Sequence, residues 1–402
     1  MLTHRLEFAP ERDAEVFSSV PVAPAVFLLR GDDSQSDPYV SKTANLRRRL
    51  IRLLGAPEER SRKLNLRDRA RWIEYTSTGS EFESGFLLYQ VLRATFPKTY
   101  SDRLRLRFAP LVKMHMENEY PRASITTRIG RLTGHSLYYG PFSSRAAAEK
   151  FANDSLDFFK MRRCVDDLHP DPAFPGCIYS EMKMCLAPCF KGCTDDQYRA
   201  EVVRVQNYFD SGGDWLVREW SAERDQASAN LEFEAASAIH VRLEKLRPVL
   251  SQLPEIVHRL DRLAGVVIQP SFQPESVALF RFDVARISGP AAFSIQQQMV
   301  AGGKAPSMEA RVQEALAALP PADVKTSLET MEHLALLKRW YYRSSRVGEI
   351  FFADDKGVLP LRRIVRAISR VYRGEKPDSE TAPTGHVLGG AESEAKGVTD
   401  ET

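Results

Sequence analysis

A tyrosine and a group of basic residues lie close together between residues 39 and 52. The tyrosine is Tyr39, and the basic residues are Lys42, Arg47, Arg48, Arg49 and Arg52. Hydrolysis of a phosphodiester needs an activated water, positive charge against the transition state and usually a divalent ion. The basic residues also suit contact with a DNA backbone. A solvated basic helix face is the alternative interpretation of the same residues.

All five cysteines lie between residues 164 and 193. Four of them follow the spacing C-x12-C-x7-C-x3-C, namely Cys164, Cys177, Cys185 and Cys189. In a reducing compartment this clustering favours a tetrahedral thiolate site over disulfides, holding either a [4Fe–4S] cluster or a structural Zn²⁺ ion. Cys193 is an additional thiol. Nearby basic residues are expected to lower the thiol pKa values, and these are Arg162, Arg163, Lys183 and Lys191. A set of idle thiols is the alternative.

Short strands and helices must position the residues around Tyr39. The apolar run at 25–29 predicts a strand, and residues 37–41 predict a second one. A basic helix follows at 43–55 and ends at Gly55. Residues 71–78 predict a third strand. The next helix, at 80–96, opens with a capping box formed by Ser80 and Glu83.

The rest of the chain continues the mixture of strands and helices. Strands are predicted at 110–116, 123–129, 136–142, 265–271 and 276–284, and helices at 143–164, 194–212, 307–319 and 325–345. Residues 214–250 predict a helical stretch broken into a hairpin. The fold class is therefore α+β. The expected boundaries are a lead-in at 1–20, a small mixed-sheet domain at 21–105, a strand, helix and cysteine segment at 106–200, a helical region at 201–252, an α+β region at 253–375 and a tail at 376–402.

Composition limits the class of protein. The chain has 402 residues, 43% of them hydrophobic, and a formal net charge of +3. No apolar run reaches the length of a membrane span, so we expect a soluble cytoplasmic protein with no membrane partner. The polar tail at 376–402 has no aromatic residue, and we expect it to be disordered. Without this acidic-leaning tail the folded part is more basic, which favours a polyanionic partner.

Four stretches, taken in order, resemble the UvrC family of nucleotide excision repair subunits. Residues 25–50 ("AVFLLR…DPYVSKTANLRRRL") are similar to the opening of its GIY-YIG nuclease domain, and residues 120–144 are similar to the segment that follows. Residues 162–189 resemble the family's cysteine region. Residues 231–246 resemble its UVR helical hairpin. The resemblance is to a short homologue without the RNase H-like and helix-hairpin-helix parts.

The resemblance implies a GIY-YIG-like site in which Tyr39, Lys42 and Arg49 are the catalytic positions. It places Phe27 where the family has its first tyrosine and Leu88 where it has a metal-binding glutamate. Leucine offers no oxygen ligand to Mg²⁺, so we expect poor Mg²⁺ binding and a degenerate nuclease site. We expect Tyr39, Lys42 and Arg49 to converge on one side of the domain, with Phe27 in the same cleft. Arg47, Arg48 and Arg52 are the expected DNA contacts.

The resemblance also implies a cofactor and a partner. For the four spaced cysteines it points to a [4Fe–4S] cluster, with Zn²⁺ as the alternative. For the hairpin it points to a UvrB-like helicase. The expected contact residues on the hairpin are Leu231, Phe233, Ile239 and Leu243. An amphipathic helix that packs into its own domain is the other interpretation of this segment.

Three functions follow from these observations. The first is a UvrC-type excision repair protein that binds damaged DNA and a UvrB-like partner, with a degenerate nuclease site. The second is an active endonuclease that makes a single incision, in which another acid holds the metal. The third is a non-enzymatic iron–sulfur adaptor. An oxygen ligand near Leu88 distinguishes the second from the first, and a DNA-binding surface distinguishes the third.

Overall fold

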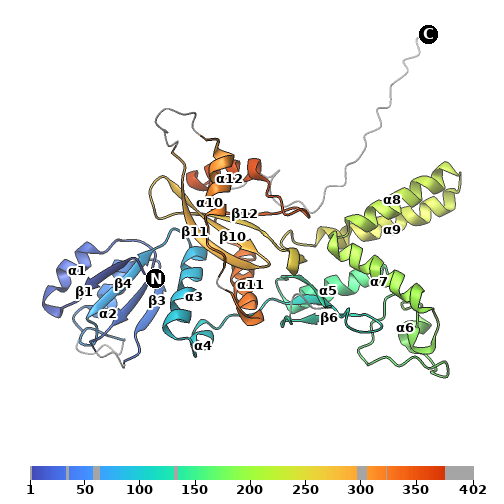
Figure 1. Cartoon of the computed structure of the whole chain (residues 1–402), viewed down its shortest axis with the longest axis horizontal. Helices are drawn as coiled ribbons and strands as arrows, with labels where there is room; N and C mark the ends of the chain where they lie inside the picture. The colour runs from blue at the N-terminus through green and yellow to red at the C-terminus, as the bar shows by residue number, and fades with distance from the viewer. Residues whose placement is uncertain are drawn as a thin grey trace, which may run out of the picture. The chain divides into compact units, whose positions relative to one another are not determined.

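The structure, a computed structural model, describes residues 2–32, 36–57, 64–130, 135–296, 306–322 and 324–375. The tail at 376–402, expected to be disordered, lies outside these residues. The chain divides into two compact units (Figure 1). The first comprises Met1–Glu119, Ala123–Ala148 and His258–Pro377, and the second is built from Tyr120–Arg122 and Glu149–Val257. Helices accompany three small antiparallel sheets, as the α+β class requires.

The N-terminal sheet has four antiparallel strands in the order β1-β4-β2-β3. They are β1 (His4–Glu7), β2 (Ala25–Arg30), β3 (Tyr39–Thr43) and β4 (Trp72–Ser77). The expected mixed sheet is wrong, because β3 and β4 both run antiparallel to β2. Residues 4–7, which we placed in a lead-in, supply the edge strand β1.

Strand β2 is buried on both faces because a helix covers each of them. Phe27 and Leu29 belong to the core that includes α2 (Leu46–Leu54), whereas Val26 and Leu28 belong to the one that includes residues of α3 (Glu81–Thr95). Side chains alternate between the two faces along a strand. The face on which a residue of β2 or β3 lies therefore decides which helix it meets. Shorter elements here are η1 (Pro10–Arg12), α1 (Asp13–Ser19) and α4 (Tyr100–Leu104).

The start of α3 agrees with the expected capping box. Ser80 is the N-cap and accepts a hydrogen bond from the Glu83 amide at 3.1 Å. The Glu83 carboxylate accepts one from the Gly79 amide at 2.8 Å, one residue earlier than in the standard motif. Gly79 must be a glycine here, because a Cβ would lie 2.3 Å from the carbonyl oxygen of Pro270.

Another sheet of the first unit packs on the far side of α3 (Figure 1). Its order is β11-β10-β9-β12. Phe82 and Phe86 of α3 meet Phe280, with ring centroids 5.0 and 6.1 Å apart. Residues of α10 and α12 cover the opposite face. The elements are η3 (Leu260–Arg262), β9 (Gly265–Pro270), β10 (Ser276–Asp283), β11 (Arg286–Ser294), α10 (Met308–Ala317), α11 (Ser327–Tyr341), β12 (Glu349–Phe352) and α12 (Leu361–Arg373).

The remaining sheet has the order β6-β5-β7-β8. Its strands are β5 (Leu111–Met114), β6 (Ala123–Thr126), β7 (Leu137–Gly140) and β8 (His258–Arg259). Helix α5 (Arg145–Leu156) follows β7. The second unit is helical, with α6 (Ile178–Glu181), η2 (Pro188–Phe190), α7 (Asp195–Asp210), α8 (Asp214–Ala229) and α9 (Phe233–Ser251). Among the described residues, no helix is long and apolar enough to cross a membrane.

His333 on α11 predicts a pH dependence of stability. Its ring is 3% exposed, and its Nδ1 accepts a hydrogen bond from the Ile287 amide at 2.9 Å. Burial, followed by the charge of Arg93, lowers its pKa to about 4, against the effect of Glu329. Between pH 6.5 and 4, His333 binds a proton in the unfolded chain but stays neutral in the folded protein. The free energy of unfolding should therefore fall by about 3 kcal/mol between pH 6.5 and 4.

Urea unfolding at a series of pH values checks this. His333→Asn keeps an acceptor near the Ile287 amide but does not titrate, so its stability should change less over this window. His240, an exposed residue of α9, gives the control His240→Asn, which should follow the unaltered protein. If the free energy of unfolding changed equally with pH in the unaltered protein and in His333→Asn, the pKa of His333 would not be lowered in the folded protein.

Candidate functional site

Tyr39, Arg49 and Phe27 come together on the face of the N-terminal sheet that α2 covers. The Arg49 Nη2 donates a hydrogen bond to the Tyr39 hydroxyl at 2.8 Å. The Phe27 ring is fully buried, with its centroid 6.0 Å from that of Tyr39. The Nε of Arg49 is buried and has no hydrogen-bond partner in the described part of the chain. Three of the four expected positions therefore share one location.

Lys42 does not join them. It lies three residues after Tyr39 on β3, and an odd spacing along a strand puts two side chains on opposite faces. Its Nζ forms an ion pair with Glu81, the first residue of α3. The expected convergence of Tyr39, Lys42 and Arg49 on one side was therefore wrong.

Leu88 lies on the α3 side, among apolar residues. It packs against the cluster of Val26, Leu28 and Val91. The nearby acids are engaged elsewhere, since Glu81 pairs with Lys42 and Glu83 with the Gly79 amide. Burial raises the pKa of Glu83. Neither carboxylate is thus free to replace the missing ligand.

The basic residues of α2 have different roles. Arg47 donates hydrogen bonds to the carbonyl oxygens of Val20 and Ser18 at 2.8 and 2.9 Å, so it ties α2 to the end of α1. These bonds hold its guanidinium against the chain, and its contact with DNA stays a prediction. Arg48 and Arg52 are exposed and remain available to a phosphate backbone.

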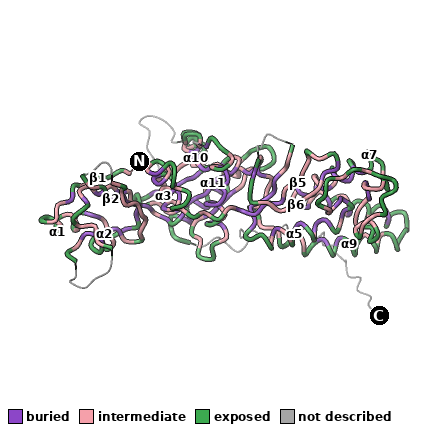
Figure 2. Tube along the Cα trace, turned by 90° about the horizontal axis from the view of Figure 1, so that it is seen from below, coloured by how far each residue is buried: buried purple, intermediate pink, exposed green. Residues whose placement is uncertain are grey.

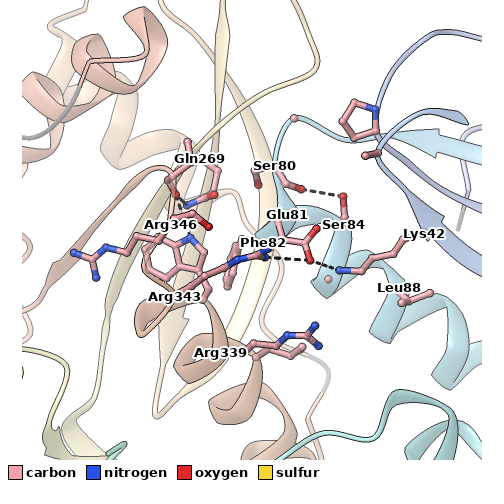
Figure 3. A pocket seen from close by; sticks show the side chains of 18 of the residues that line it. Lys42, Ser80, Glu81, Phe82, Ser84, Leu88, Gln269, Arg339, Arg343 and Arg346 are labelled. Carbon is pink, nitrogen blue, oxygen red and sulfur yellow. Dashed lines mark hydrogen bonds and ion pairs between the residues drawn. The ribbon is translucent and has the colours of Figure 1, made fainter. Parts of the chain in front are cut away.

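A cavity of about 510 Å³ lies on the α3 side of the same unit (Figure 3). Residues from β3, α3, α4, β9 and α11 line it, and cationic side chains predominate over acidic ones. These are Lys42, Arg103, Arg339, Arg343 and Arg346, with Glu81 as the acid. Sequence reasoning missed the site, although the run "RWYYRSSR" at 339–346 was a signal of basic and aromatic residues.

The four spaced cysteines lie near one another in the second unit. Burial raises the pKa of Cys185 to about 11, and the neighbouring thiols Cys164, Cys189 and Cys177 raise it further. Burial also raises the pKa of Cys189. The expected lowering of thiol pKa values by basic neighbours is thus wrong for these two residues, because burial outweighs the backbone N–H groups that lower the pKa.

The donor set suits a thiolate-bound metal or cluster. The Arg162 Nη1 lies 3.5 Å from the Cys164 Sγ, and the Ala187 amide lies 3.3 Å from the Cys185 Sγ. Such N–H donors stabilise thiolate ligands. Within the described residues, however, no three acidic, histidine or cysteine side chains stand in metal-ligating positions. The metal site therefore stays a prediction.

Helices α8 and α9 form a hairpin that turns at residues 230–232. Figure 2 shows that much of α9 is exposed. At the turn, Leu231 is 72% and Phe233 64% exposed. Ile239 is half-buried, but Leu243 is only 4% exposed. Leu243 packs inside the protein and offers little surface to a partner, and the contact of this hairpin with a partner stays a prediction.

The comparisons with known proteins agree with one another. Residues 109–208 match the family described as UvrC/Cho excinuclease, middle domain. Over 256 residues the chain is 28% identical to the UvrABC system protein C of Carboxydothermus hydrogenoformans, an alignment that covers 63% of the chain and 41% of that relative. Over 208 residues it is 26% identical to the protein of the same name in Rickettsia africae, covering 52% of the chain and 32% of the relative. The chain thus spans less than half the length of these curated relatives. No solved structure matches it.

Proposed function

Because the chain is a relative of the UvrC family, we propose that it is a nucleotide excision repair protein that binds DNA and a UvrB-like partner without cutting DNA at its N-terminal site. The observation that carries the non-cutting part is the arrangement around β3. Tyr39 and Arg49 lie on one face, and Lys42 and Leu88 on the other. Cleavage needs these groups around one phosphate.

Exposed arginines on α2 support DNA binding. Arg48 and Arg52 stand four residues apart, so they share a helix face and can contact neighbouring phosphates. Such contacts need no metal ion. They also make binding weaken steeply with salt, because each neutralised phosphate releases counterions.

The affinity for duplex DNA with a bulky lesion, measured by fluorescence anisotropy at several salt concentrations, tests this function. The slope of log K against log salt is negative, and in the double variant Arg48→Ala/Arg52→Ala it should become less steep by about 2. Arg199→Ala removes an exposed charge in the second unit and should leave the slope unchanged. The unaltered protein with Mg²⁺ should leave the DNA intact.

Three other results of this experiment would contradict the proposed function or favour an alternative one. An unchanged slope in the double variant would remove α2 from the DNA surface. No binding by the unaltered protein at low salt would favour the iron–sulfur adaptor. Mg²⁺-dependent incision that Tyr39→Phe abolishes would show an active nuclease.

A further inference from the structure

The basic cavity of the first unit brings together cations from distant parts of the sequence. Lys42 comes from β3, Arg103 from α4, and Arg339 from α11. Arg343 and Arg346 follow α11 directly. Positive charges that line one cavity repel one another unless an anion lies among them. Lys42 and Leu88 of the candidate nuclease site also line this cavity, whereas Tyr39 and Arg49 do not.

The protein itself supplies only part of the counter-charge. Glu81 pairs with Lys42 and lies 3.5 Å from the Nη1 of Arg343. Figure 3 shows Glu81 between these two side chains. The guanidinium of Arg339 is exposed and has no partner among the described residues. Arg103 pairs with Asp37 at 2.9 Å. The five cations thus face two carboxylates, and the remaining excess of positive charge can hold a doubly charged anion.

The remaining wall is apolar. It includes Leu88, Leu104, Leu106 and Leu336, and the aromatic rings of Phe82 and Trp340. A bare inorganic anion would gain nothing from these side chains. A cavity of about 510 Å³ falls within the range of sites for small organic ligands.

One buried polar group in the wall also lacks a partner. Gln269 is 1% exposed, and its Nε2 donates to the carbonyl oxygens of Ile268 and Val347 at 3.1 and 3.0 Å. These two bonds fix the orientation of the amide. Its Oε1 then has no donor within the described chain. The Oε1 atom is itself buried in the protein, so a ligand in the cavity does not reach it, and Gln269 contributes to the shape of the wall rather than a hydrogen bond.

We propose that this cavity is a binding site for a nucleoside phosphate, supplied either as a free nucleotide or as the phosphorylated end of a DNA strand. Arg339 and Arg343 hold the phosphate, and the leucines contact the base and sugar. Glu81 competes with the phosphate for Lys42 and Arg343. The proposal goes beyond the repair function and does not depend on DNA binding by α2.

Two variants should act in opposite directions. Arg339→Ala/Arg343→Ala should weaken binding at least tenfold, because two phosphate contacts are lost. Glu81→Gln should strengthen it several-fold, because Lys42 and Arg343 are released. Arg362→Ala removes a charge from an exposed residue of α12 outside the cavity and should change nothing.

Isothermal titration calorimetry of the full chain provides the measurement. The probes are inorganic phosphate, a deoxynucleoside 5′-monophosphate, and a short single-stranded oligonucleotide with a 5′-phosphate. We expect the nucleotide to bind more tightly than phosphate. Tight binding of the oligonucleotide alone, with the same response to both variants, would identify the strand end as the source.

Two results would overturn the proposal. One is equal affinity for phosphate and nucleotide, which would exclude recognition of the nucleoside. The other is binding that neither Glu81→Gln nor the double arginine variant alters, which would place the ligand elsewhere. The variant Arg48→Ala/Arg52→Ala should retain nucleotide binding, so failure at this cavity and failure of the DNA-binding function remain distinguishable.

Discussion

Replacing Phe233 by Asp is expected to abolish binding to a UvrB-like helicase without unfolding the chain. Phe233 is 64% exposed at the start of α9, next to Leu231, which is 72% exposed. Leu231 also has a φ of 62°, which a leucine adopts only at a cost. Two exposed apolar side chains at a strained turn suit a partner groove. A carboxylate there would have to be desolvated, so we expect a loss of at least a hundredfold.

A pull-down and a titration with the partner's C-terminal hairpin check this prediction. Val203 is 52% exposed on α7, and Val203→Asp places the same charge on another exposed apolar site of the second unit. That control should bind normally. Circular dichroism should show the same helix content for both variants. Undiminished binding by Phe233→Asp would mean that the hairpin tip is not the contact.

If the four spaced cysteines hold the metal or cluster that we predict, replacing Cys185 by Ala is expected to remove it. The protein purified with adequate iron should be brown, and Cys185→Ala should lose the colour together with its iron. The pKa of Cys185 is raised by burial and by the charges of the other three spaced cysteines, so this thiol lies close to all of them. A cluster or metal ion needs its thiolates deprotonated, so binding must offset this raised pKa. Loss of one ligand should also lower the melting temperature of the second unit.

Visible absorbance and metal analysis of the purified protein distinguish the outcomes. Cys193→Ala should keep the colour, because Cys193 lies outside the C-x12-C-x7-C-x3-C spacing. A colourless protein with one zinc ion per chain would replace the cluster by a structural zinc site. Retention of colour and iron by Cys185→Ala would exclude this cysteine as a ligand.

Local signals in the sequence were enough to locate most elements. The apolar run before Arg30 is β2, and the basic segment after Asn45 is α2, with the Asn45 side chain capping it. Ser80 begins α3 as its capping box indicates. These features depend on neighbours within about four residues, so a single sequence carries them. The sequence also shows directly that residue 88 is a leucine and offers no oxygen ligand.

The contacts between distant segments were decided by the tertiary structure. The odd spacing of Tyr39 and Lys42 on β3 puts them on opposite faces, but the packing of α3 against this sheet decided that Glu81 would be the partner of Lys42. The sequence alone does not show that the guanidinium of Arg47 donates hydrogen bonds to carbonyl oxygens of Ser18 and Val20 at the end of α1.

The sequence by itself therefore determined many of the helices and strands, although not β1, β11, β12 or α12, and the chemistry of each side chain. It could not determine the cavity between Lys42 and Arg343, which lie some 300 residues apart in the chain. That cavity exists because α3 is buried between two sheets, so that its N-terminus meets the end of α11. Burial of apolar surface drives this assembly, and apolar contact is not directional. The sequence pattern shows that the apolar side chains of α3 must be buried. Only the folded chain shows which elements bury them.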